Sequence, residues 1–120
     1  MTDIPNGVTI EPTWVIEATY ALDAAETRGP FRARHLARIV ELEEAGVIIE
    51  AGAFADMSGS IIIVRAPDEA AALEVVRADI YMANGVWVEL RARPFGRVIS
   101  SESVGSESQP RATGPGAAGS

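Results

Sequence analysis

The sequence predicts an α+β fold in which a four-stranded antiparallel sheet carries two helices on one of its faces. Three observations lead to this prediction. Four segments have the apolar alternation or the short apolar run of strands, and two others repeat apolar residues at helical spacing. The order of these segments along the chain is β-α-β-β-α-β. Joined by right-handed crossovers, that order gives the ferredoxin-like split βαβ arrangement.

Residues 13–46 predict the first strand and the first helix. The segment TWVIEATY, residues 13–20, alternates so that one face is strongly apolar. That face consists of Trp14, Ile16, Ala18 and Tyr20. Residues 21–29 are expected to form a turn or a short helical approach. Pro30 suits the first turn of a helix, which runs to about residue 45 and stops at Gly46.

Two further strands, residues 47–54 and 59–65, are expected to form a hairpin around a short loop. The run Ile61–Val64 in the second of them is apolar on both faces. We therefore expect this strand to be central in the sheet and covered on both sides.

The second helix is expected to begin around Pro67, where acidic residues follow near the positive end of the helix dipole. Its buried stripe consists of Ala72, Leu73 and Val76. The last strand covers residues 86–95. Its inward side chains are expected to be Val86, Val88, Leu90 and Ala92.

The chain divides into three parts by composition. Residues 1–12 carry two prolines and scattered acids, and are expected to form a flexible arm. Residues 13–98 form the folded domain. Residues 99–120 are rich in Ser, Gly, Ala and Pro, with almost no bulky side chains, so they bury too little surface to offset the entropy of ordering. We expect this tail to be disordered.

The sheet face opposite the helices is predicted to be unusually apolar. It should carry Val15, half of the Ile61–Val64 run and Trp87, mixed with Glu17, Glu89, Arg91 and Arg93. An exposed surface of this kind favours a second subunit as its cover, so a homodimer is expected. The alternative is that the arm or the tail folds back over it.

Composition excludes several classes of function. The chain has no cysteine and no lysine, and all ten basic residues are arginine, so thiol nucleophiles, cysteine zinc sites and Schiff-base chemistry are excluded. One histidine cannot supply a multi-histidine metal site. The net charge of −7 argues against nucleic-acid binding. No long apolar run predicts a membrane span or a secretory signal, so we expect a cytoplasmic protein.

The only histidine, His35, falls on the apolar arc of the first helix, together with Phe31, Ile39 and Leu42. A polar ring in that position needs a partner. Asp79 is the best candidate, because it follows Val76 on the buried side of the second helix, at a C-terminal end where an acid opposes the helix dipole. The two side chains are expected to meet in the cleft between the helices. The pair would act as a general base or, alternatively, only fix the helix packing.

Other residues are weaker candidates for substrate binding. Arg32 and Arg34 flank His35 and suit an anionic substrate, although such arginines are often solvated or paired with nearby glutamates. The Ser60 hydroxyl follows Gly59 and is a second candidate, or simply a turn residue. Tyr81 offers a hydrogen-bond donor to the cleft, or only packs there.

Four segments together resemble the YCII-related family over residues 14–97: GPFRARHLARI, AGAF, SGSIIIV and ADIYMANGVWVELRARPF. His35 matches the family histidine in R-x-x-H-L, and Asp79 matches the aspartate of the D-P-Y…A-G-V segment. Here Ile80 replaces the usual proline, and Asn84 replaces the alanine before Gly85. The resemblance implies a ferredoxin-like fold of the dimeric α/β-barrel superfamily, with a His–Asp pair in a cleft.

The resulting hypothesis is a cofactor-free enzyme of the lyase or isomerase type that acts on a small organic substrate. His35 would remove a proton next to a carbonyl or on an activated ring, and Asp79 would orient the imidazole. The resemblance points to proton transfer, because dehydrochlorination of an aromatic and lactone isomerisation occur in the resembled family and superfamily. A non-catalytic dimeric module that binds a small molecule or serves as an accessory protein is the alternative; an oxygenase without a cofactor is a third.

Overall fold

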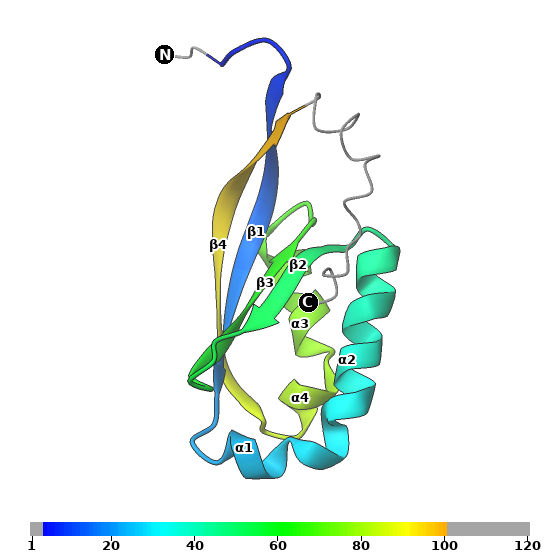
Figure 1. The fold of residues 1–120 in the computed structure, drawn as a ribbon, viewed down its shortest axis with the longest axis vertical. Helices are drawn as coiled ribbons and strands as arrows, with labels where there is room; N and C mark the ends of the chain where they lie inside the picture. Colours follow the sequence, from blue (N-terminus) through cyan, green and yellow to red (C-terminus); the bar gives the residue numbers. More distant parts are fainter. Residues whose placement is uncertain (1–3, 101–120) are drawn as a thin grey trace. The chain divides into compact units, whose positions relative to one another are not determined.

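The computed structural model describes residues 4–100, which form eight elements (Figure 1). These are β1 (Val8–Tyr20), α1 (Ala24–Thr27), α2 (Gly29–Glu44), β2 (Ile48–Ala53), β3 (Gly59–Val64), α3 (Glu69–Arg77), α4 (Ile80–Ala83) and β4 (Trp87–Ser100). The chain separates into two compact units, of which residues 12–95 form one. Residues 1–11 and 96–120 form the other.

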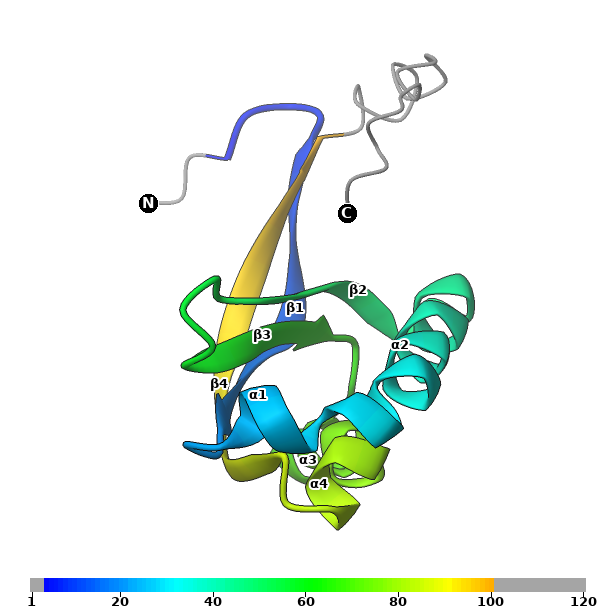
Figure 2. The same ribbon diagram turned by 60° about the horizontal axis from the view of Figure 1, so that its bottom comes forward.

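The strands form one antiparallel sheet in the order β2-β3-β1-β4 (Figure 1). This is the strand order of the ferredoxin-like fold, so the predicted fold class is confirmed. β3 lies inside the sheet, as its apolar run predicts. Within residues 12–95 the helices lie on the same side of the sheet (Figure 2).

The face of the sheet that meets the helices is built from the predicted positions. Ile16 pairs with Ile62 across β1 and β3, and both side chains are fully buried. The next inward pair along the same strands is Ala18 with Ser60, and both are buried as well. Because successive side chains of a strand point to opposite faces, the register that buries these residues turns Val15 and Glu17 to the other side.

Helix α2 covers this face with the arc that the sequence predicts. His35 is buried in it, and Phe31, Ile39 and Leu42 pack against the core. The helix ends at Glu44 with Ala45 as its C-cap, and Gly46 follows with a φ of 82°, a left-handed conformation that glycine adopts without strain. Pro30 lies in its first turn, as expected.

Helix α3 is also amphipathic in the predicted way, because Ala72 and Val76 are buried and Leu73 packs against them. Its N-cap is Asp68, whose side chain accepts a hydrogen bond from the Ala71 amide at 2.9 Å. The helix was expected to continue to Asp79, but it stops two residues earlier, at Arg77. The chain then turns and begins the short helix α4.

The prediction for the last strand was right for Val86, which is fully buried, but wrong for Trp87 and Val88. Trp87 is 2% exposed and belongs to the core instead of the outer face, whereas Val88 is 57% exposed instead of pointing inward. Val86 and Trp87 are both buried because Val86 precedes the strand and is not bound to its alternation. Leu90 and Ala92 pack against the core as predicted. The side chain that faces the core is thus at an odd-numbered position at Trp87 and at even-numbered positions from Leu90 onward. The strict alternation of the strand is broken between these two residues.

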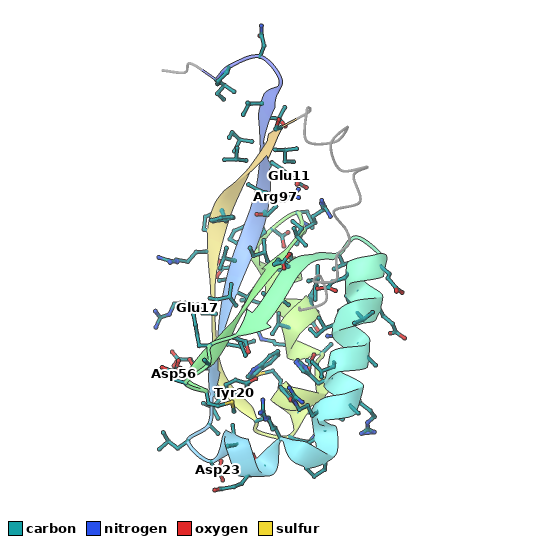
Figure 3. All side chains as sticks on the ribbon, in the orientation of Figure 1. Glu11, Glu17, Tyr20, Asp23, Asp56 and Arg97 are labelled. Carbon is teal, nitrogen blue, oxygen red and sulfur yellow. The ribbon has the colours of Figure 1, made fainter. Side chains whose placement is uncertain are left out.

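Residues 4–11 and 96–100 are the described part of the second unit. β1 begins at Val8, so residues 8–12, predicted as part of a flexible arm, are extended strand. Arg97 donates a hydrogen bond to the Glu11 carboxylate at 2.9 Å in this unit (Figure 3). β4 extends to Ser100, so residues 99 and 100, which were predicted as the start of the disordered tail, belong to a strand. The rest of that tail, residues 101–120, lies outside the described residues.

Candidate functional site

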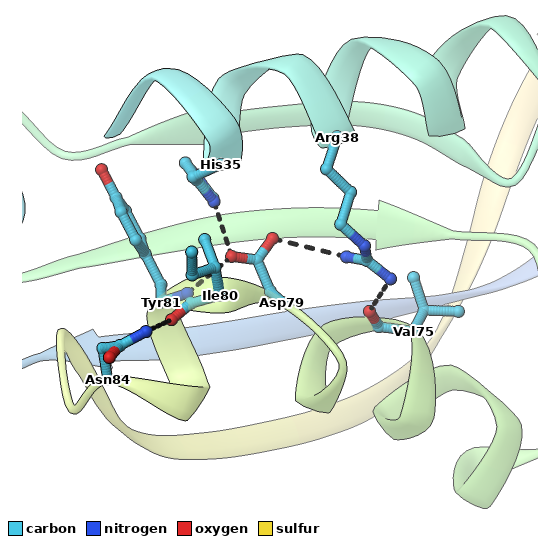
Figure 4. Close-up of polar contacts among 7 residues, drawn as sticks. All are labelled: His35, Arg38, Val75, Asp79, Ile80, Tyr81 and Asn84. Atoms are coloured by element: carbon cyan, nitrogen blue, oxygen red, sulfur yellow. Dashed lines mark hydrogen bonds and ion pairs between the residues drawn. The ribbon is translucent and has the colours of Figure 1, made fainter. Parts of the chain in front are cut away.

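His35 and Asp79 meet, as the sequence predicts. The Nδ1 atom of His35 lies 2.8 Å from Oδ1 of Asp79, across 44 positions of sequence (Figure 4). The histidine comes from the middle of α2 and the aspartate from the turn between α3 and α4. Asp79 is 1% exposed and His35 is 7% exposed. The two groups are thus removed from water and paired with each other, which is what their burial requires.

Asp79 does not sit at the end of a helix that opposes its charge, so that part of the prediction was wrong. It is the N-cap of α4, and its Oδ1 accepts a hydrogen bond from the Tyr81 amide at 2.9 Å. An acid at this place is favourable for the new helical turn. Ile80, which replaces the family's proline, occupies the first position of α4, and the side-chain amide of Asn84 donates to its carbonyl at 3.0 Å (Figure 4).

Arg38 completes the surroundings of the carboxylate, although it was not among the residues predicted for the site. Its Nη2 donates to the Val75 carbonyl at 2.9 Å, and its Nη1 lies 3.4 Å from Oδ2 of Asp79 (Figure 4). The sequence feature that could have identified Arg38 is its position one turn after His35 on the same helix. Arg38 thus connects α2 with the end of α3 and holds the oxygen of Asp79 that His35 leaves free.

These contacts decide the charge of the aspartate. Burial raises the pKa of the Asp79 carboxyl. The hydrogen bonds from His35 and from the Tyr81 amide, with the positive charge of Arg38, outweigh burial, so the pKa lies below its ordinary value. The carboxylate is therefore ionised at neutral pH, and its Oδ1 can accept a hydrogen bond from a protonated Nδ1 of the imidazole.

Aromatic rings enclose the imidazole. Tyr81 stacks on His35 with ring centroids 3.8 Å apart and planes at 10°, and Trp87 meets His35 edge-on at 5.1 Å. Tyr20 approaches Tyr81 from β1 with centroids 6.3 Å apart. Burial raises the pKa of Tyr81, so its hydroxyl is neutral at physiological pH. Only 9% of the His35 side chain is exposed, and no hydrogen bond reaches its Nε2 from residues 4–100.

The structure brings only some of the other candidates to this pair. Tyr81 touches the imidazole directly. Arg32 and Arg34 are both exposed; Arg32 lies about 60° from His35 around the axis of α2, and Arg34 lies about 100° away. Ser60 is buried in the sheet face beside Ala18 and borders a different hollow, of about 180 Å³, that also has Glu17 and Arg91 in its wall.

Two fully buried side-chain polar atoms have no hydrogen bond among the described residues. They are Nε1 of Trp87 and Oγ1 of Thr27. The described residues hold no group of three His, Cys, Asp or Glu side chains that could bind a metal ion. In the same part of the chain, no helix combines the length and the apolar character needed to cross a membrane.

A search of solved structures finds a similar fold in 5-chloro-2-hydroxyhydroquinone dehydrochlorinase (TftG) from Burkholderia phenoliruptrix AC1100, in complex with 2,5-dihydroxybenzoquinone. The two proteins superpose with a TM-score of 0.58 at 20% sequence identity, over 68% of this chain and 90% of that one. At this identity the likeness supports the fold. No curated protein sequence matches the chain.

A comparison with models of protein families gives a direct result. The model of the YCII-related domain matches residues 13–96, which is more than half of the chain and nearly all of the larger unit. The match includes most of the first strand, the paired residues His35 and Asp79, and most of the last strand. The chain belongs to the family of YCII-related domain proteins.

Proposed function

We propose that this protein is an enzyme that needs no cofactor and moves a proton on a small organic substrate, in a lyase or isomerase reaction. His35 is the general base and Asp79 orients it. The observation that carries the proposal is the 2.8 Å contact between Nδ1 and Oδ1, in which an ionised carboxylate engages one nitrogen of a histidine ring. The other nitrogen has no protein partner among residues 4–100, and the proposal assigns it to the substrate.

The contact fixes the chemistry of the ring. Because Asp79 is ionised, it accepts a hydrogen bond, so the proton of a neutral imidazole resides on Nδ1 and the lone pair on Nε2. Nε2 can then take a proton from a carbon acid next to a carbonyl or on an activated ring. Asp79 stabilises the imidazolium that forms, and Arg38 keeps the carboxylate in place throughout.

The structural neighbour supports this reaction class. Its name describes the removal of HCl from a chlorinated, hydroxylated ring. Loss of HCl requires a base that accepts the proton while chloride departs with the electrons of its bond to carbon. A histidine held by a carboxylate is a suitable base for that step. Chlorinated hydroquinones are therefore the first substrates to test.

The experiment measures chloride release from 5-chloro-2-hydroxyhydroquinone by the wild type and by H35Q and D79N. We expect each variant to lose on the order of 10²- to 10⁴-fold in kcat, the usual contribution of a positioned base. E41Q is the matched control, because Glu41 is an exposed acid on the same helix. Circular dichroism verifies that the variants are folded.

A second function is favoured by the enclosure of the ring, since only 9% of the His35 side chain is exposed. In this alternative the protein is a non-catalytic module that binds a small molecule. The same samples distinguish the two. Ligands that raise the melting temperature of the wild type without any turnover would favour the binding module. Turnover that survives in H35Q would contradict His35 as the general base.

We also propose that the protein is a homodimer whose subunits pack through the sheet face opposite the helices. That face carries Ile61 and Ile63 from β3 next to Val15 from β1, and Val88 is more than half exposed. A hollow of about 290 Å³ over β2 and β3 has both isoleucines in its wall. Exposed apolar surface of this kind is a usual feature of subunit contacts.

A further inference from the structure

The charges of α2 are placed against its own dipole. Arginines occupy its N-terminal half, including Arg28 at the N-cap, and its acids, Glu41, Glu43 and Glu44, lie at the C-terminal end. No acid stands in the first turn and no base in the last. Helix α3 shows the opposite arrangement, with Glu69 in its first turn and Arg77 in its last. Because the positive end of a helix disfavours cations, the arginines of α2 do not contribute to the stability of the helix through its dipole.

Two of these arginines lie on the face of α2 that carries His35. At about 100° per residue, Arg28 and Arg32 fall within about 60° of His35 around the helix axis, and Arg34 does not. Both guanidinium groups lower the pKa of Tyr81, against the effect of burial, so their charges reach the ring that stacks on the imidazole. Among residues 4–100 neither arginine forms an ion pair.

The one buried carboxylate of the site does not neutralise them. Asp79 is already engaged by His35 and by Arg38. The imidazole, which is more than nine-tenths buried, has its Nε2 without a partner within residues 4–100. The site thus combines an unpartnered nitrogen with two uncompensated cations from the same helix face.

We propose that Arg28 and Arg32 bind the negative group of the substrate, so that the site selects small organic anions, carboxylates or phenolates, and presents them to Nε2 of His35. This rests on the proposed function and adds the substrate class to it. The same two charges stabilise the negative charge that develops on the substrate when the base removes its proton. Charges that act on a substrate in this way explain an arrangement that the helix dipole disfavours.

The test uses the fact that the chain has a single histidine, so the imidazole gives one Cε1–H signal in NMR spectra. Benzoate and benzamide, a charged and a neutral molecule of nearly the same shape, are titrated into the wild type. We expect benzoate to shift the His35 signal with a Kd of about 1 mM, as two charge-assisted contacts would give. We expect benzamide to bind at least about tenfold more weakly, and benzoate binding to weaken as salt is added.

Three variants identify the residues responsible. R28Q and R32Q are each expected to weaken benzoate binding about tenfold and to leave benzamide unchanged. R34Q is the matched control, because Arg34 is exposed on another side of the same helix, and it should bind benzoate like the wild type. Equal binding of the two probes, equal losses in R34Q and R32Q, or no benzoate shift at all would overturn the inference.

The result does not depend on turnover, so it separates the two proposals. Selective benzoate binding together with an H35Q variant that retains full turnover would leave the anion site in place and remove the proposed base. Loss of turnover in H35Q with no preference for anions would do the reverse. The variants should melt no lower than the wild type, since they remove charges that the dipole disfavours.

Discussion

Asp79 is the residue on which most of the site depends. One carboxylate group accepts from the His35 ring and from the Tyr81 amide through Oδ1, and Arg38 engages its other oxygen. It therefore starts α4, fixes the imidazole and connects to α2 at two points. A buried aspartate without these partners would be strongly destabilising, because nothing would offset the loss of its hydration.

The lowered pKa of Asp79 predicts a specific dependence of stability on pH. In acid the unfolded chain takes up a proton at this group before the folded chain does, because the folded pKa is the lower one. The contribution of Asp79 to the free energy of unfolding is thus complete above its unfolded pKa of about 3.8 and is lost as the pH falls through the folded pKa.

Urea denaturation of the wild type and of D79N at several acidic pH values measures this effect. D79N is expected to be less stable at neutral pH and to lose less stability than the wild type as the pH is lowered. Parallel pH curves for the two proteins would show that the hydrogen bonds of the carboxylate do not hold it ionised.

The sequence predicted the His35–Asp79 pair but not its setting. The pair could be predicted because a lone histidine on an apolar arc and an acid on the buried side of a helix both need partners. Arg38 was missed because it reads as one of several surface arginines until its contact with the Val75 carbonyl is known. The position of Trp87 was missed because strand alternation was extended across Val86, a residue outside the strand.

At the scale of elements, the junction between α3 and α4 is the place where the sequence pattern did not predict the end of a helix. The pattern predicts one helix through Asp79, whereas the chain ends α3 at Arg77 and starts a four-residue helix at Ile80. A turn of this length has too few residues to show a period of its own. The 16-residue helix α2 was predicted well, because its apolar spacing repeats over several turns.

The close approach of β1 to β3 requires a glycine at position 59. A Cβ atom on Gly59 would lie 2.8 Å from the carbonyl oxygen of Ala18, which belongs to the backbone of the neighbouring strand. G59A is therefore expected to lower the free energy of unfolding by about 1–3 kcal/mol, the usual cost of inserting a group into packed structure.

Gly52, on the partner strand of the same hairpin, provides the matched control. A Cβ there meets nothing within 4 Å. G52A is expected to be neutral or to stabilise by about 0.4–1 kcal/mol, because alanine restricts the unfolded chain. Denaturation curves of the two variants measure the difference, and equal stabilities would show that the sheet adjusts to the extra atom.

At the scale of the whole molecule, no helix of the described residues covers the outer face of the sheet in the larger unit (Figure 2). The sequence correctly predicted apolar side chains there from β1 and β3, but the tryptophan expected among them lies in the core. Charged groups share the face, since Arg91 lies 4.0 Å from Glu17 and 3.9 Å from Glu89. Such exposed pairs contribute little to stability within one subunit. Across a dimer interface they would help to set the orientation of the partner.

The dimer is tested by placing a charge in the middle of that face. Ile63 lies on β3 opposite Val15, on the side of the sheet away from the helices. Sedimentation is expected to give twice the chain mass of 12.7 kDa for the wild type, and the single mass for I63E, because a buried unpaired carboxylate opposes association. V40E places the same charge at an exposed apolar position on α2 and should remain dimeric. A wild type that sediments as a monomer would contradict the interface, and a change in its stability on removal of residues 101–120 would then favour the tail as the cover. Dissociation of V40E to the same extent as I63E would place the contact on another surface.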